Sequence, residues 1–225
     1  MKLRVLEEIK RLRDAGEIDD ETYLKLRKVV ERPFEIDLGE IFAKYGVSGN
    51  SLVLDVAAGG SGTGPKILGR NIIALDISIE EIDSAVKEKA YAQWICADAR
   101  KLPFKDNSIE FVITFIGLAY IHGRENKLKV LKEAYRTLKN DGSLLLVEPK
   151  IAENCRDYMG YFVVYKKGVL INETILGVSG ENIMQTQKLL VELLQNAGFE
   201  TNIEKEDDIF VIVGKKKLRK CYEAS

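Results

Sequence analysis

The stretch "LVLDVAAGGSGTGPKILGRNIIALDIS", residues 52–78, decides the fold. It runs from one apolar segment to another through a glycine-rich loop. An apolar segment that ends in such a loop predicts a buried strand that turns into a helix, and Pro65 suits the first turn of that helix. In sheets built this way the loop lies at the carboxyl edge, where ligands bind. The loop is therefore the first candidate for a ligand site.

The alternation of apolar segments and helical stretches continues beyond the loop. The predicted buried strands are 51–57, 71–77, 92–98, 109–116 and 143–149. Helices are predicted between them, over 78–90 and 125–140. Near-continuous apolar strands that alternate with helices indicate a parallel sheet covered on both faces, so the fold class is α/β.

The pattern changes after residue 150. Residues 157–177 are rich in aromatic and β-branched side chains, and "KKG" at 166–168 predicts a hairpin turn. A helix is predicted over 181–198. The segments 199–205 and 208–215 then predict a final antiparallel pair of strands.

Residues 5–31 predict two short amphipathic helices joined by "AGEIDD", with Asp19 or Asp20 as the N-cap of the second helix. The segment also resembles the short helical-hairpin oligomerisation motif known as SHOCT. Two interpretations stay open: the hairpin packs on the main domain as a packing element or lid, or it joins copies of the chain into a homo-oligomer. We divide the chain into an N-terminal extension, 1–45, and a main domain, 46–225.

Composition excludes several classes of protein. The 225 residues are 46% hydrophobic and 31% charged with a net charge of −1, which gives no global attraction to nucleic acid or anionic membrane. The basic cluster at 215–220 is expected to be a solvated tail. No segment resembles a signal peptide or a membrane span, so a cytoplasmic protein is expected. The cysteines are too widely spaced for a CxxC metal or redox motif, and no metal site is expected: Cys96, Cys155 and Cys221.

The spacing of the glycines excludes two phosphate-binding motifs. Gly59 and Gly64 have the separation of a P-loop, but Pro65 stands where the lysine should be and Lys66 follows one place late. The dinucleotide fingerprint G-x-G-x-x-G fails in each register, because Pro65 or Ile67 falls at the last glycine. A pyrophosphate ligand is therefore disfavoured.

A third class of site fits several segments in order. "VLDVAAGGSG", "ALDIS", "CADARKLPFKDNSIEFVIT" and "EAYRTLKNDGSLLLVEP" resemble the class I S-adenosylmethionine-dependent methyltransferases, and within them the ubiquinone/menaquinone-biosynthesis group. The resemblance covers roughly residues 50–150. It implies a Rossmann-like, doubly wound, mostly parallel seven-stranded sheet with the last strand antiparallel. It also implies S-adenosyl-L-methionine as the cofactor, and an acceptor-recognition insertion at about 150–181.

The resemblance further implies a set of cofactor-binding residues. They are Asp55, Ala57, Gly59, Gly60, Asp76, Ile77, Asp98, Ala99, Phe115 and Ile116. The small loop residues would let the backbone approach the methionine end of the ligand, and Asp55 would place negative charge near its cationic groups. Asp76 would accept both ribose hydroxyls, as the acid of the dinucleotide site does. A helix N-cap is the alternative role for Asp76.

The remaining residues of the set would surround the adenine ring and the methionine end. Ile77 would lie on one face of adenine, Asp98 would accept its amino group, and Ala99 would donate its amide to the ring. A turn residue is the alternative role for Asp98. Phe115 and Ile116, after the fourth strand, would line the methionine end.

The loop departs from the family pattern Asp-x-Gly-x-Gly-x-Gly. Ala57 and Ser61 stand where the first and third glycines should be, and Gly62 and Gly64 follow at once. A shifted loop could bind the ligand through these later glycines.

Methyl transfer needs few catalytic groups, because the sulfonium leaving group supplies the driving force and the protein aligns the reactants. His122, the only histidine, is the candidate general base, and capping or packing is its alternative role. Tyrosines are candidates for the wall of the acceptor pocket, with core packing as the alternative: Tyr120, Tyr158, Tyr161 and Tyr165.

The acceptor is expected to be a small, apolar or partly aromatic molecule, because the segment 150–181 is rich in such side chains. The place after the fourth strand reads "TFIG" rather than Asn/Asp-Pro-Pro-Tyr, which disfavours transfer to amide and exocyclic nitrogens. No cysteine follows a proline, as cytosine-C5 enzymes require. Two alternatives remain: an RNA or protein methyltransferase, and a non-catalytic regulatory protein that binds S-adenosylmethionine.

Overall fold

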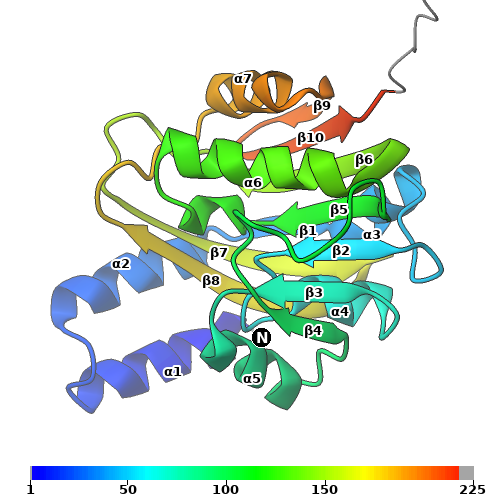
Figure 1. Ribbon diagram of the computed structural model, residues 1–225. Helices are drawn as coiled ribbons and strands as arrows, with labels where there is room; N and C mark the ends of the chain where they lie inside the picture. Colours follow the sequence, from blue (N-terminus) through cyan, green and yellow to red (C-terminus); the bar gives the residue numbers. More distant parts are fainter. Residues whose placement is uncertain (1, 218–225) are drawn as a thin grey trace, which may run out of the picture.

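The computed structural model describes residues 2–217, with the side chains of 5–204 and 207–217. Its main element is a seven-stranded sheet in the order β4-β3-β2-β5-β6-β10-β9 (Figure 1). The strands are β2 Val53–Val56, β3 Ile73–Asp76, β4 Gln93–Cys96, β5 Ile109–Phe115, β6 Leu138–Pro149, β9 Glu200–Glu206 and β10 Ile209–Lys215. The pairs of β10 with β6 and with β9 are antiparallel, and the other pairs are parallel. The predicted mostly parallel sheet with an antiparallel last strand is confirmed.

Two apolar layers enclose this sheet. The elements that follow the strands are α3 Leu38–Lys44, α4 Thr63–Leu68, α5 Ile79–Lys87, the 3-10 turn η1 Leu118–Tyr120, α6 Arg124–Thr137 and α7 Gln187–Ala197. Because side chains alternate along a strand, Val112 and Leu144 pack toward α6 and α7, whereas Ile113 and Leu145 pack on the opposite side. Figure 1 shows α6 and α7 in front of the sheet and α3 behind it.

A second, three-stranded sheet covers the back of the main sheet. It consists of β1 Phe34–Asp37, β7 Asp157–Lys166 and β8 Val169–Ser179, with β1 parallel to β7. The predicted hairpin turn is present at Lys167 and Gly168, which both have positive φ. Phe162 and Val164 of β7 belong to the same apolar core as the back of the main sheet. The sequence reasoning did not find β1 or α3.

The N-terminal hairpin packs on this second sheet. Its helices are α1 Lys2–Asp14 and α2 Asp20–Glu31. Asp19 is the N-cap of α2, since its carboxylate accepts the backbone N–H of Thr22 at 2.7 Å. Ile9 and Val30 are buried together with Tyr161 and Val163 of β7. The chain itself therefore buries part of the apolar faces of the two helices, whereas Leu24 is 52% exposed.

Helix α7 begins later than predicted. The sequence predicts a helix from 181, but α7 starts at Gln187, where the N-cap Thr186 side chain accepts the N–H of Leu189 at 3.2 Å. Just before it, Gln185 and Ile151 exchange two backbone hydrogen bonds of 2.9 Å. This bridge holds the segment in an extended conformation, so the helix cannot extend toward 181.

The C-terminal basic cluster is not simply a solvated tail. Lys215 is the last residue of β10, and Lys216 is 8% exposed, with its Nζ donating to the carbonyls of Tyr135 and Leu138 at 2.7 Å. The rest of the cluster and Cys221 lie outside the described residues. Cys96 and Cys155 are free thiols. Over residues 2–217 no helix is long and apolar enough to cross a bilayer, and no cluster of side chains there could hold a metal ion.

Candidate functional site

A cavity of about 610 Å³ opens at the carboxyl edge of the main sheet. Its volume lies within the range usual for small-molecule sites. Every predicted cofactor residue except Asp55 lines it, and so does His122: Ala57, Gly59, Gly60, Asp76, Ile77, Asp98, Ala99, Phe115 and Ile116. Other lining residues were not predicted: Glu81, Arg100, Asn126, Thr174 and Ile175.

The loop after β2 forms one wall of the cavity. The residues that face the cavity are those that align directly with the family motif, 57–61, and not the later glycines. Ala57, in the first glycine position, has φ 54°, a left-handed conformation that disfavours side chains larger than glycine. Ser61 also lines the cavity. Gly62 and Gly64 do not: a Cβ on Gly62 would lie 2.2 Å from that of Ala90, so the bare backbone there serves packing.

Asp76 holds this loop from the tip of β3. Its Oδ2 accepts the N–H of Gly59 at 2.9 Å, and its Oδ1 accepts the N–H of Ser78 at 3.1 Å. The N-cap of α5 is Ser78 and not Asp76. A carboxylate oxygen has a second lone pair, so Asp76 keeps acceptor capacity toward the cavity that it lines.

Asp98 is engaged by a neighbouring guanidinium. The guanidinium of Arg100 donates to both carboxylate oxygens, with an Nη2 to Oδ2 distance of 2.7 Å. The backbone N–H of Arg100 donates to Oδ1 at 2.8 Å. These hydrogen bonds lower the pKa of Asp98. Asp98 therefore combines its two predicted roles: its carboxylate accepts the N–H of Arg100 in a local turn, and the residue also lines the cavity.

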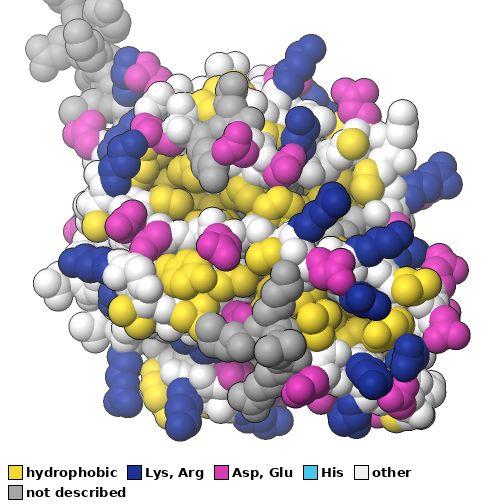
Figure 2. Space-filling view, turned by 180° about the vertical axis from the view of Figure 1, so that it is seen from behind, with side chains coloured by type: hydrophobic (Ala, Val, Ile, Leu, Met, Phe, Trp, Pro, Cys, Tyr) yellow, Lys and Arg dark blue, Asp and Glu magenta, His cyan; other side chains and the backbone are white. Residues whose placement is uncertain are grey.

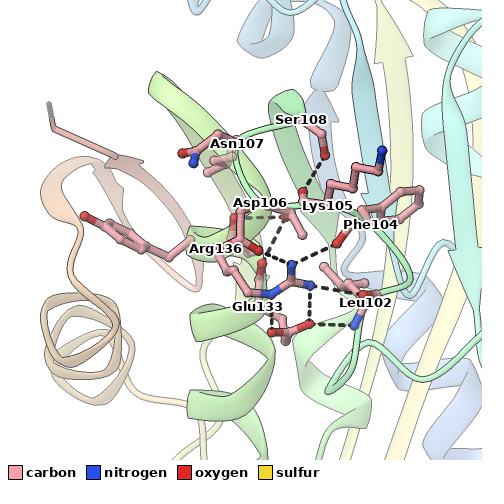
Figure 3. Close-up of polar contacts among 12 residues, drawn as sticks. Leu102, Phe104, Lys105, Asp106, Asn107, Ser108, Glu133 and Arg136 are labelled. Carbon is pink, nitrogen blue, oxygen red and sulfur yellow. Dashed lines mark hydrogen bonds and ion pairs between the residues drawn. The ribbon is translucent and has the colours of Figure 1, made fainter.

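The segment that follows Asp98 in the chain is held by Arg136 of α6 (Figure 3). Its guanidinium donates to the carbonyls of Leu102 and Phe104 at 3.1 and 2.8 Å and to Asp106 at 2.7 Å. Glu133 completes the cluster, accepting from Arg136 and from the N–H of Leu102 at 2.8 Å. Two carboxylates in contact raise the pKa of Arg136, so its charge is permanent.

The end of β5 forms the facing wall. Phe115 and Ile116 are 8% and 7% exposed, and Ile116 has φ 54°, an unusual conformation for a β-branched residue. A Cβ on the next residue, Gly117, would lie 2.9 Å from the carbonyl oxygen of Ala57. The two walls therefore approach each other as closely as bare backbone allows.

A buried polar network that the sequence reasoning missed supports this wall. Glu148 of β6 accepts the N–H of Leu118 at 3.0 Å and the hydroxyl of Thr114 at 2.8 Å. Lys127 of α6 donates to the carbonyl of Leu118 and to Gln185 Oε1, and Gln185 Nε2 donates to Glu148 at 3.1 Å. Burial raises the pKa of Glu148 and lowers that of Lys127. Both backbone groups of Leu118 are thus fixed by buried side chains.

The cavity is also lined by residues from other elements. Tyr120 and His122 come from the segment after β5, and Thr174 and Ile175 come from β8 of the second sheet. His122 is exposed, and Asn126 donates to its carbonyl at 3.0 Å. The other candidate tyrosines do not line the cavity: Tyr158, Tyr161 and Tyr165. Tyr161 is 2% exposed, beneath the N-terminal hairpin.

Asp55 differs from its predicted role. It is 2% exposed and lies behind the loop, where a Cβ on Gly64 would be 2.0 Å from its Oδ2. Burial, followed by the charge of Asp76, raises the pKa of Asp55 to about 8. At pH 7 this carboxyl group is mostly neutral, so it places no full negative charge near the cavity.

The fold and the cavity together define a class of protein. A glycine loop on one parallel strand, an acid at the tip of the next and a second acid after the third make a site for a nucleoside-type ligand across the carboxyl edge. The lining fits S-adenosyl-L-methionine, since it combines a loop of small residues that allows close approach, acids suited to hydroxyl and cationic groups, and apolar walls. Asp76, Asp98 and the loop backbone are the parts that would hold it.

Comparisons with known proteins identify a methyltransferase domain within the chain. Residues 54–146 match the family model described as a methyltransferase domain. The chain is 29% identical to the demethylmenaquinone methyltransferase of Chlorobaculum tepidum, over 66% of this chain and 65% of that protein. It is 32% identical to an uncharacterized protein of Methanocaldococcus jannaschii, over 63% of this chain and 61% of that protein. Residues 54–146 therefore match a methyltransferase domain, and the chain spans less than two thirds of the length of these two relatives.

Solved structures agree on the fold. A SAM-dependent methyltransferase of Methanosarcina mazei has a TM-score of 0.58 at 22% identity, covering 82% of this chain and all of that chain (100%). A SAM-dependent methyltransferase of Aquifex aeolicus has a TM-score of 0.58 at 17% identity, covering 93% of this chain and 97% of that one. At these identities the likeness shows the shared fold alone.

Proposed function

We propose that this protein transfers the methyl group of S-adenosyl-L-methionine to a small, partly apolar acceptor. The observation that carries the proposal is the composition of one cavity. The loop, Asp76 and Asp98 form its polar part, while Phe115 and Ile175 contribute apolar surface. The demethylmenaquinone and ubiquinone/menaquinone C-methyltransferases among the relatives support a quinone-like acceptor.

The chain's own groups have three tasks in this reaction. When bound, the cofactor supplies an activated methyl group. The walls formed by Phe115, Ile116 and β8 align an acceptor and keep water out. His122, which lines the same cavity, is the group placed to accept a proton if the acceptor must lose one.

A small acceptor is favoured over RNA by the charge distribution. Figure 2 shows the face opposite α6 and α7, on which Lys and Arg side chains are interspersed with Asp and Glu. A nucleic-acid surface would concentrate positive charge instead. Within the basic cluster, Lys216 is engaged with backbone carbonyls inside the fold.

The test follows a labelled methyl group. The full chain is incubated with methyl-labelled S-adenosylmethionine and a cell extract, and label is counted in the solvent-extractable, RNA and protein fractions. We expect label in the solvent-extractable fraction, and transfer to demethylmenaquinone when that compound is supplied alone. Label in RNA or protein would contradict a small acceptor, and cofactor binding without transfer to any fraction would contradict the enzyme.

Asp76→Ala tests whether the cofactor binds in this cavity, and Asp83→Asn is its control. It removes the acid that would bind the ribose, so we expect cofactor affinity by calorimetry to fall at least about tenfold, the loss of a charge-assisted hydrogen bond. Asp83→Asn, on the exposed side of α5, should leave the affinity unchanged.

A further inference from the structure

Glu81 of α5 turns its carboxylate toward the cavity although the local sequence offers it another partner. Ser78-Ile79-Glu80-Glu81 has the spacing of a capping box, in which the glutamate accepts the N–H of the N-cap serine. Only half of that arrangement forms. The Ser78 hydroxyl accepts the N–H of Glu81 at 3.1 Å, but the N–H of Ser78 donates to Asp76. Glu81 Oε2 instead accepts the N–H of Gly60 at 2.5 Å.

This contact places a second acid on the loop wall. Asp76 binds the N–H of Gly59, and Glu81 binds the N–H of the following residue, Gly60. Both acids line the cavity. Across the cavity, burial raises the pKa of the Tyr120 hydroxyl, and the charges of Glu81 and Asp76 raise it further.

No basic group balances these two acids. Arg100 is the only Lys or Arg among the residues that line the cavity, and its guanidinium is paired with Asp98. Within the described part of the chain neither Asp76 nor Glu81 forms an ion pair. The cavity thus carries an excess of negative charge on the wall formed by the loop.

We propose that Glu81 is a specificity determinant that makes the cavity prefer the cationic cofactor to its neutral demethylated product, S-adenosylhomocysteine. The inference rests on the proposed function. In methyl transfer the bond between sulfur and the methyl carbon breaks, its electron pair stays on sulfur, and the acceptor's electron pair forms the new bond. The sulfur loses its positive charge while the ribose and adenine are unchanged. A fixed carboxylate therefore favours the substrate over the product and assists product release.

Solvent screening limits how much Glu81 can favour S-adenosylmethionine over S-adenosylhomocysteine. Glu81 is an exposed residue, so water and salt screen its charge more than they would screen a buried one. We expect a preference of about threefold from this side chain, which is the scale of a single ion interaction in a high dielectric.

The test compares two dissociation constants measured by calorimetry, one for S-adenosylmethionine and one for S-adenosylhomocysteine. In Glu81→Gln we expect the first to rise about threefold with little change in the second. Glu80→Gln is the control with the same charge change on the adjacent residue, whose carboxylate contacts the Ser78 hydroxyl at the surface. It should change neither constant. The wild-type preference should also shrink between about 0.05 and 0.5 M salt.

A conservative variant separates charge from hydrogen bonding. Glu81→Asp keeps the charge but shortens the reach to Gly60, so it should retain most of the preference. If Glu81→Gln weakens both ligands equally or neither, Glu81 acts on a part they share, or on nothing, and the inference is wrong. If the wild-type protein binds neither ligand, the proposed function itself fails, which is a distinguishable outcome.

Discussion

Asp55 is a buried acid whose protonation changes within an accessible pH range. Its pKa is raised to about 8, whereas an unfolded chain would give it a value near 3.9. The folded state therefore keeps a proton that the unfolded state loses, and stability falls as pH rises from about 4 to 8. Above pH 8 the folded protein must hold a buried carboxylate beside Asp76.

Asp55→Asn removes this titration while keeping the shape of the side chain. We expect the variant to be more stable than the wild type at pH 9 by about 2–5 kcal/mol, with the difference shrinking as pH falls toward 5. Denaturant unfolding at several pH values measures it. The exposed acid variant Asp83→Asn should leave the pH dependence unchanged, and parallel curves for Asp55→Asn would contradict the assignment.

Residue roles could be predicted where they follow from a motif, but not where they depend on burial. Asp76 and Asp98 were placed in the cavity wall because the motifs put them at strand ends. Asp55 was predicted to contact the cofactor as well, but it does not line the cavity, because its burial behind Gly64 depends on how the loop folds over it. Lys127 was missed although a signal existed: it shares the apolar stripe of α6 with Val130, Leu131 and Ala134 at helical spacing.

At the scale of elements, α6, β6 and the segment before α7 are joined by the buried network around Leu118. Lys127→Met should destabilise the fold by about 3 kcal/mol, because it leaves the buried Glu148 without a cation. The double variant Lys127→Met/Glu148→Gln should recover part of the loss, since neither charge remains. Thermal and denaturant unfolding of the four proteins in this cycle gives the coupling.

An exposed pair provides the comparison. Arg124 and Glu192 join α6 to α7 at the surface, so Arg124→Met should cost less than about 1 kcal/mol. Equal losses for the Arg124 and Lys127 variants, or strictly additive effects in the double variant, would contradict the role of the network.

Elements with a long hydrophobic pattern were predictable, and short ones were not. The strands of the main sheet lie within the predicted segments, except that β6 begins earlier, at Leu138, and β9 ends one residue later, at Glu206. β1 has only four residues, so its alternation is too short to distinguish from a loop, and it exists because β7 provides a partner. The start of α7 depends on the contact between Gln185 and Ile151, which no local pattern reveals.

At the scale of the whole molecule, the N-terminal hairpin covers β7. Deleting residues 1–31 would expose Tyr161 and Val163, so we expect lower thermal stability without a change in the number of chains per particle. Light scattering and thermal unfolding measure the two effects. A full-length oligomer that dissociates on deletion would instead support the homo-oligomer interpretation. Arg11→Ala, on the exposed side of α1, should leave both properties unchanged.

The order of the strands became predictable only through the resemblance to a family. Alternating strands and helices indicate a parallel sheet but not which strands are neighbours. The second sheet was not predicted, because it joins residues 34–37 to residues 157–179, which are far apart in the chain.

The pairing of β1 with β7 has a consequence for engineering. Thr174 and Ile175 reach the cavity from a sheet whose third strand, Phe34–Asp37, lies near the start of the chain. A chimera that takes only the segment from 150 to 181 of a relative would receive two strands whose side chains pack against that relative's own β1, and not against Phe34–Asp37 of this chain. Exchanging acceptor preference within this family therefore requires moving two distant pieces of the gene together.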